Sequence, residues 1–171
     1  MGTNLKFSLA GPLSQRVLIT CIILALAVGY SISLLQVRNR GSFNLKETVR
    51  HFRGAESSSP EGEGIYVPQS DTALISVAHV HTFSQPIVLS VMGFLFLLTS
   101  LSEGVKVFWI LLSFFGSFAM NLSPWLIRDV SPGFVCLLYV GGTAMIASFC
   151  VMAVKVLYET WWGKISIETE K

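Results

Sequence analysis

The sequence predicts an all-α integral membrane protein: a four-helix bundle with an interfacial amphipathic helix between helices 1 and 2. Of the 171 residues, 52% are hydrophobic, only 13% are charged, and the apolar residues gather into four long runs. A soluble domain usually has about a quarter charged residues, whereas a run of roughly 20 apolar residues can cross a hydrocarbon core. Because no room is left for a separate soluble domain, residues 1–171 are interpreted as one transmembrane domain in a lipid bilayer.

The four apolar runs define the predicted membrane spans. They lie at about residues 17–37, 82–101, 107–126 and 133–157, with an extramembrane segment at about 38–81. The first run follows a basic start, so a cleaved signal peptide is the rival interpretation. The length of the run, and the absence of a small-residue cleavage site after it, favour a retained membrane helix.

A short amphipathic helix is predicted inside the extramembrane segment. Ser42 can cap its start and Gly54 can end it. Leu45, Val49 and Phe52 share one face of this helix, and the basic residues between them are available to lipid headgroups. This pattern is typical of a helix that lies in the membrane interface.

The stretch from Asp71 to Leu101 contains two histidines, His79 and His81, followed by Pro86. A helix of about 30 residues measures about 45 Å, which exceeds a hydrocarbon core of roughly 30 Å. The first turns, with both histidines, are therefore expected at the membrane interface. Because Pro86 has no N–H to donate, a kink or a restart of the helix is expected there.

Three sets of small or polar residues recur at helical spacing and predict positions where helices pack closely. Small side chains let two backbones approach in a membrane, and serine or asparagine can hydrogen-bond across the contact. The three sets are Ala25, Gly29 and Ser33; Ser113, Ser117 and Asn121; and Gly141, Ala144 and Ser148.

The histidines are the sharpest candidate site residues. Two residues apart on a helix, His79 and His81 point about 200° away from each other, so at most one is expected to serve a given site. His81 is preferred because Gln85 lies on its side of the helix. Single histidines on separate helices are how membrane bundles hold haem b, so a haem b or a metal is a possible cofactor. The candidate ligands are His81, His79 and His51, with Met92 and Met120 as thioether alternatives.

Two other interpretations of the histidines stay open. They can be interfacial residues that hydrogen-bond to Asp129, a serine or backbone carbonyls, or they can handle protons or a quinol, because histidine titrates near neutral pH. Arg128 and Asp129 are expected on the same side of the membrane as the histidines. There they can form an ion pair, or Asp129 can orient a histidine; a solvated helix end is the alternative.

Several functional classes are disfavoured. The formal charge of +2 is too small to argue for a nucleic-acid partner. The three cysteines lack the spacing of a zinc site or of covalent haem attachment, and no hydrolase or nucleotide-binding motif is present. No predicted span has a charge near its middle, which argues against a transport path through one copy.

Three short segments, HVHTF (79–83), SPWLIRDVSP (123–132) and LYETWW (157–162), lie in the block from His79 to Trp162, which is about half of the chain. In these segments the chain resembles a group of small four-span bacterial inner-membrane proteins with a His-x-His-x-Phe segment. None of the segments is a catalytic signature, and the resemblance implies no established activity. It implies a bacterial membrane location and directs attention to His79, His81, Trp125 and Arg128.

The leading functional hypothesis is an accessory or assembly subunit without catalysis of its own. It would dock through the small-residue stripes to other subunits of a larger, redox-linked membrane complex, or to copies of itself. The alternative is a b-type haem or metal-binding electron-transfer protein that uses His81 or His79. Basic residues divide evenly between the two sides of the bundle, so the positive-inside rule gives no orientation. Short connections on the side of the N-terminus favour cytoplasmic termini in a bacterial inner membrane.

Overall fold

The structure, a computed structural model, describes residues 8–41, 43–54 and 67–163. Within these ranges the chain forms α-helices, one 3₁₀ helix and no strand. The elements are α1 (Leu13–Gly41), α2 (Leu45–Arg53), α3 (Asp71–Leu97), α4 (Glu103–Asp129), η1 (Pro132–Phe134) and α5 (Val135–Trp162). The predicted all-α class, with a short helix between the first two long ones, is therefore confirmed.

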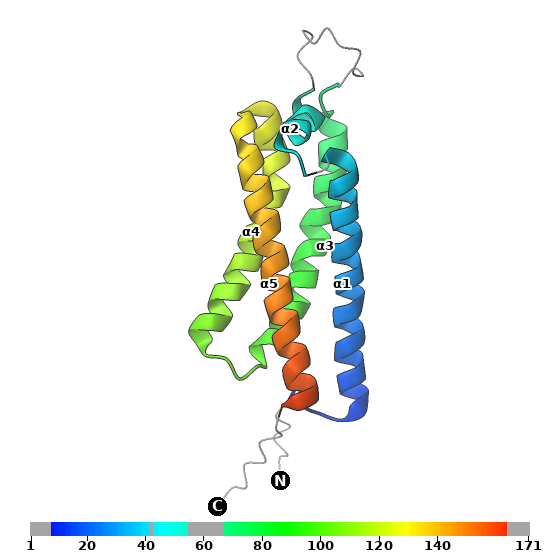
Figure 1. The fold of residues 1–171 in the computed structure, drawn as a ribbon, viewed down its shortest axis with the longest axis vertical. Helices are drawn as coiled ribbons and strands as arrows, with labels where there is room; N and C mark the ends of the chain where they lie inside the picture. Colours follow the sequence, from blue (N-terminus) through cyan, green and yellow to red (C-terminus); the bar gives the residue numbers. More distant parts are fainter. Residues whose placement is uncertain (1–7, 42, 55–66, 164–171) are drawn as a thin grey trace, which may run out of the picture.

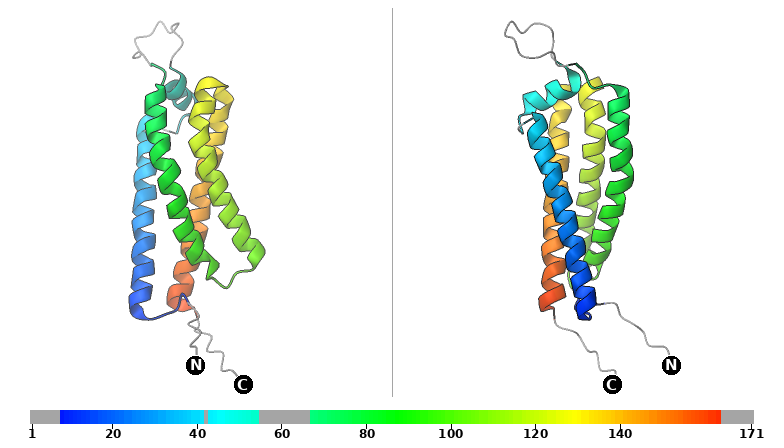
Figure 2. Two further views of the ribbon diagram at one scale, coloured as in Figure 1. Left: turned by 180° about the vertical axis from the view of Figure 1, so that it is seen from behind. Right: turned by 90° about the vertical axis from the view of Figure 1, so that its right-hand side faces the viewer.

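The four long helices α1, α3, α4 and α5 run side by side, and α2 lies across one end of the bundle (Figure 1). The start of α1 and the end of α5 lie together at the opposite end (Figure 2). We call these the α2 end and the terminal end. Each long helix is long and apolar enough to cross a membrane, and a helix satisfies its own backbone groups where lipid cannot. The protein is therefore a multi-pass membrane protein.

Helix α3 begins at Asp71, where the sequence predicts the start of the helix in the Asp71–Leu101 stretch, and it is not interrupted at its proline. The hydroxyl of Ser70 accepts a hydrogen bond from the N–H of Ala73 (3.2 Å) and caps its start. The helix then continues through Pro86 to Leu97, so of the two expected outcomes at Pro86, a kink or a restart, the restart is wrong. Its 27 residues measure about 40 Å, so about 10 Å of α3 must extend beyond a 30 Å hydrocarbon core.

The start of α2 differs from the predicted one. Ser42, the predicted cap, lies outside the described residues. Asn44 caps the helix, because its side chain accepts a hydrogen bond from the N–H of Lys46 (2.9 Å). Gly54 ends the helix as predicted, with a positive φ of 80° that a glycine adopts without strain.

Side-chain bonds fasten α2 to two of the long helices. The hydroxyl of Thr48, which is buried, lies 2.9 Å from the hydroxyl of Tyr139 in α5. The Nη1 of Arg53 donates to the carbonyl oxygen of Ile127 in α4 (3.0 Å). Helix α2 therefore has a fixed position over the end of the bundle.

Helices α4 and α5 make the most extensive helix contact of the described structure. Its centre is a pair of buried glycines. A Cβ atom added to Gly116 would lie 2.6 Å from the carbonyl oxygen of Gly141, and one added to Gly141 would lie 2.7 Å from the Cβ of Ala119. The two backbones thus touch, as small residues permit in membranes. Towards the terminal end the two helices diverge (Figure 1).

At the terminal end, one carboxylate ties the turn between α3 and α4 to α5. The two carboxylate oxygens of Glu159 accept hydrogen bonds from the backbone N–H of Ser100 (3.0 and 2.9 Å) and one also accepts from its hydroxyl (2.6 Å). Lys155 lies 2.8 Å from the same carboxylate, one helical turn earlier. The carboxylate thus provides hydrogen-bond acceptors for the backbone N–H and the hydroxyl of Ser100, which lies in the turn between the two helices.

Helix α1 is the least embedded of the four long helices. Ile19 and Ile23 reach the hydrophobic core, and the indole N–H of Trp161 donates to the hydroxyl of Thr20 (3.0 Å). These contacts attach α1 to α5, and its other end contacts α2. Only 11% of the most apolar 18-residue stretch of α1 is buried, whereas 28% of the corresponding stretch is buried in each of the other three spans. Most of α1 therefore faces outward.

Candidate functional site

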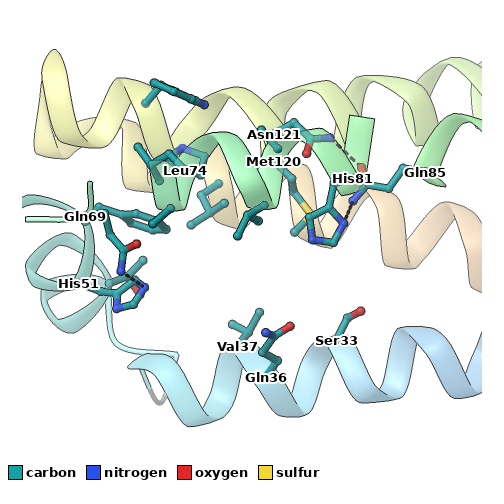
Figure 3. A pocket seen from close by; sticks show the side chains of 18 of the residues that line it. Ser33, Gln36, Val37, His51, Gln69, Leu74, His81, Gln85, Met120 and Asn121 are labelled. Atoms are coloured by element: carbon teal, nitrogen blue, oxygen red, sulfur yellow. Dashed lines mark hydrogen bonds between the residues drawn. The ribbon is translucent and has the colours of Figure 1, made fainter. Parts of the chain in front are cut away.

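A cavity of about 190 Å³ lies at the α2 end, and all five α-helices contribute to its lining. Figure 3 shows His81 and Gln85 of α3 on one side and Ser33, Gln36 and Val37 of α1 on the other. Most of the lining is apolar, and among the described lining residues none is Lys, Arg, Asp or Glu. The polar side chains in the lining are those of Ser33, Gln36, Thr48, His51, Gln69, His81, Gln85 and Asn121.

His81 is held by a hydrogen-bond network that joins α3 to α4. The side-chain oxygen of Gln85 accepts from the hydroxyl of Ser117 (2.6 Å) and from the amide of Asn121 (2.8 Å). The amide nitrogen of Gln85 lies 3.4 Å from the Nδ1 of His81, one helical turn away (Figure 3). Asn121 also donates to the carbonyl oxygen of Ser117 (2.9 Å), which fixes its own amide.

This network determines the tautomer of His81. Because two donors occupy the oxygen of Gln85, its NH₂ group is the part that faces the imidazole, and an amide nitrogen only donates. The Nδ1 of His81 must then be the acceptor, so the proton of the neutral ring lies on Nε2. His81 therefore presents an N–H donor to the cavity.

His79 does not belong to the cavity. Its side chain is exposed on α3 and packs edge-on against Phe83, with 5.2 Å between the ring centroids. Among the described residues that line the cavity, His81 is present and His79 is not. The helical spacing of two residues separates the two rings, which is the separation that the sequence predicts.

His51 lines the same cavity from α2. Its Nε2 lies 3.3 Å from the amide nitrogen of Gln69, in the chain just before α3. Of the two methionines considered as thioether ligands, Met120 lines the cavity with His81 (Figure 3). Met92 is instead buried in the hydrophobic core, with 1% of its surface exposed.

Arg128 ties the end of α4 to the start of α3. Its guanidinium contacts the carboxylate of Asp71 (2.5 Å), both carboxylate oxygens of Asp129 (2.7 and 2.9 Å) and the carbonyl oxygen of Gln69 (3.0 Å). It also lies 5.4 Å from the ring centroid of Trp125, a cation–π distance. Asp129 thus faces an arginine, and the described bonds of His81 go to Gln85. The Arg128 cluster holds the rim of the cavity in place.

The three small-residue stripes lie in different surroundings. In α5, Gly141 and Ser148 are buried against neighbouring helices and Ala144 is half-buried. In α4, Ser113 and Ser117 are buried and Asn121 is half-buried. The stripe of α1 differs from these two: its members, Ala25, Gly29 and Ser33, are exposed in the described structure, and Ser33 also lines the cavity.

The sequence alone did not single out three features. Gly116 packs against Gly141, and Glu159, which lies inside the LYETWW segment, accepts hydrogen bonds from Ser100. Gln36 faces His81 from α1 (Figure 3). A polar residue near the end of an apolar run is a possible signal for Gln36. The partners of Gly116 and Glu159 depend on how the helices pair.

Residues 42–166 match the model of a family described as a transmembrane helical domain, Aq_1264_TM. The match covers most of the chain, so the protein belongs to this family. It begins after α1 and includes α2 to α5. No curated protein and no solved structure matches the chain.

Proposed function

We propose that this member of the transmembrane helical domain family is a non-catalytic accessory or assembly subunit, which docks through α1 to a larger membrane complex. A bacterial inner-membrane location, cytoplasmic termini and a link to redox chemistry are parts of this proposal. With this orientation the α2 end and its cavity lie on the side of the membrane that faces away from the cytoplasm. The partner can be another subunit or a second copy of this chain.

The observation that carries the proposal is the exposed stripe of α1. Ala25, Gly29 and Ser33 stand one turn apart and are exposed in the described part of the chain, and Ser33, at the α2 end of the stripe, also borders the cavity. A Cβ atom added to Gly29 would meet nothing within 4 Å. The hydroxyl of Ser33 donates to the carbonyl oxygen of Gly29 (3.0 Å), so it adds no unsatisfied group to a membrane surface. Such a smooth groove lets a second helix approach closely.

The other stripes strengthen the case for α1 by contrast. The Gly141 stripe is used inside the chain, where it packs against α4. The Ser117 stripe is also used inside, since it bonds to Gln85. Helix α1 is thus the element best placed to serve an intermolecular contact.

A matched pair of substitutions tests docking. Gly29→Leu fills the groove of α1, whereas Ala147→Leu adds bulk at an exposed position of α5. After purification in a mild detergent, the wild type and Ala147→Leu should retain the same partner chains, and Gly29→Leu should lose them. A photo-crosslinking amino acid at position 29, but not at position 147, should capture the same partner. A wild-type protein that runs as a stable isolated monomer would contradict the proposal.

A b-type haem or a metal at His81 is the second candidate function. It is favoured by the fact that His81, Met120 and His51 line one cavity. The volume of about 190 Å³ speaks against a haem, because pockets for drug-sized molecules already enclose roughly 300–1,000 Å³. Visible spectra and metal analysis of the purified protein test this candidate. A reduced-state Soret band that His81→Ala removes and His79→Ala keeps would support it, and a colourless, metal-free preparation would refute it.

A further inference from the structure

We propose that the cavity beside His81 binds the single-ring head group of a lipid-soluble quinone or quinol, with its apolar tail leaving the protein sideways between α1 and α3. The proposal concerns binding and does not depend on what docks against α1. The size of the cavity, the chemistry of its lining, the position of its opening and its depth in the membrane support such a ligand.

The size of the cavity fits one substituted ring. Its volume is about 190 Å³, and an apolar protein cavity of roughly 150 Å³ is known to hold benzene. A macrocyclic head would require the helices to move apart. A benzoquinone-type head, one six-membered ring with small substituents, can enter without that movement.

The chemistry of the lining fits a neutral head group with oxygen atoms. The Nε2–H of His81 is free of the Gln85 bond and can donate to a quinone carbonyl or a quinol hydroxyl oxygen. Gln36 offers an amide on the opposite wall. Within the described lining no lysine or arginine is available to neutralise a phosphate, so a phospholipid head would be buried without a counter-charge, which is costly.

The opening of the cavity lies between α1 and α3. A shallower groove shares Gln36, Val77 and His81 with the cavity and adds Ser76 and Val80 from the outward side of α3. Val80 is 60% exposed, so an apolar surface leads from the cavity to the outside of the bundle. Among the described helices, α1 packs mainly on α5 and α2 and not along α3, which leaves this side open.

The depth of His81 places the opening at the level of the lipid chains. His81 lies ten residues after the start of α3 at Asp71, which is about 15 Å along the helix axis. About 10 Å of α3 extends beyond the hydrocarbon core. Even if all of that length lies at the α2 end, His81 is a few Å inside the core. A tail that leaves beside Val80 therefore passes directly into lipid.

Fluorescence of Trp125, which lines the cavity, provides a binding assay. The full-length protein in detergent micelles is titrated with a decyl-substituted benzoquinone, which quenches nearby tryptophans. A short-chain phosphatidylglycerol is titrated in parallel as the phosphate-headed alternative. Trp125→Phe identifies the signal from the cavity, because the other tryptophans, Trp109, Trp161 and Trp162, do not line it.

Two pairs of variants test the site itself. His81→Leu removes the donor and His79→Leu is its exposed control two residues away. Ala78→Leu fills the cavity from α3 without removing a polar group, and Ala147→Leu is its lipid-facing control. Circular dichroism checks that each variant is folded. If a variant of one pair does not fold, the other pair still tests the site.

We expect saturable quenching in the wild type, His79→Leu and Ala147→Leu. Binding should weaken about tenfold in His81→Leu, which corresponds to the loss of one hydrogen bond to a buried polar group, and at least as much in Ala78→Leu. Quenching that is non-saturable, that persists in Trp125→Phe, or that is equal in His81→Leu and His79→Leu would overturn the proposal. Saturable binding of the phosphatidylglycerol in place of the quinone would overturn it as well. Gly29→Leu should bind the quinone normally, so this test and the docking test can fail separately.

Discussion

Replacing Gly116 with alanine tests the contact on which α4 and α5 depend. A methyl group at this position would point at the backbone of α5, 2.6 Å from the carbonyl oxygen of Gly141 and 2.9 Å from the backbone nitrogen of Met145. Ordinary van der Waals contact begins near 3.4 Å, so the methyl group is about 0.8 Å too close to the oxygen. No side chain can rotate away, because both obstructing atoms belong to a helix backbone.

The expected cost follows from that geometry. The two helices must separate, and the buried side chains beside Gly116 then lose contacts as well. Overpacking a core typically costs about 1–3 kcal/mol, and we expect Gly116→Ala to fall in this range. Alanine is otherwise favoured over glycine inside a helix by roughly 0.5–1 kcal/mol. The substitution therefore reverses the usual sign.

Unfolding by SDS in mixed micelles, followed by circular dichroism, measures this cost. Gly104→Ala is the matched control, because a Cβ atom there would meet nothing within 4 Å on the same helix α4. We expect Gly104→Ala to unfold at the wild-type SDS fraction or a higher one, and Gly116→Ala at a clearly lower one. Equal stability of Gly116→Ala and the wild type would refute the proposed backbone contact.

Two further predictions concern the polar contacts at the ends of the bundle. Glu159→Ala should destabilise the protein by about 1 kcal/mol, because charge-assisted hydrogen bonds to a partly exposed turn are lost, and hydrogen exchange at Ser100 should accelerate; unchanged exchange there would count against the role of Glu159. Arg128→Lys should loosen the first turn of α3, because an ammonium cannot replace a planar fork that contacts Asp71, Asp129 and the Gln69 carbonyl at once. Hydrogen exchange in that turn measures the change, and full protection in the variant would show that the fork is dispensable.

The fold was largely predictable from the sequence because lipid restricts the choices. A long apolar run in a membrane must be helical to satisfy its backbone, so four such runs determine four helices. Their ends were less predictable, because lipid does not decide where a helix stops beyond the bilayer. Helix α3 starts at Asp71, where the sequence predicts its start, but it ends at Leu97, four residues before the predicted end at Leu101. The cap of α2 at Asn44 also depends on local geometry that the composition of the loop does not reveal.

The features of the candidate site that could be predicted are those that depend on the geometry of a single helix. The separation of His79 and His81, and the position of Gln85 on the side of His81, follow from 3.6 residues per turn. The bonds from Ser117 to Gln85 and the cavity itself could not be predicted, because they depend on how α3 rotates against α4. Helix pairing in membranes lacks a strong hydrophobic signal that could be read from periodicity.

The contacts at the two ends have a mechanical consequence. Arg128 joins α4 to α3 at one end, Glu159 joins the α3–α4 turn to α5 at the other, and the Gly116 contact joins α4 to α5 between them. The three helices α3, α4 and α5 are therefore held together by specific contacts at both ends of the bundle and near its middle. Helix α1 lies outside this group of three helices and contacts mainly α5 and α2. When the protein is pulled apart by force, α1 should peel away first, and the group of three helices should yield later, in one step.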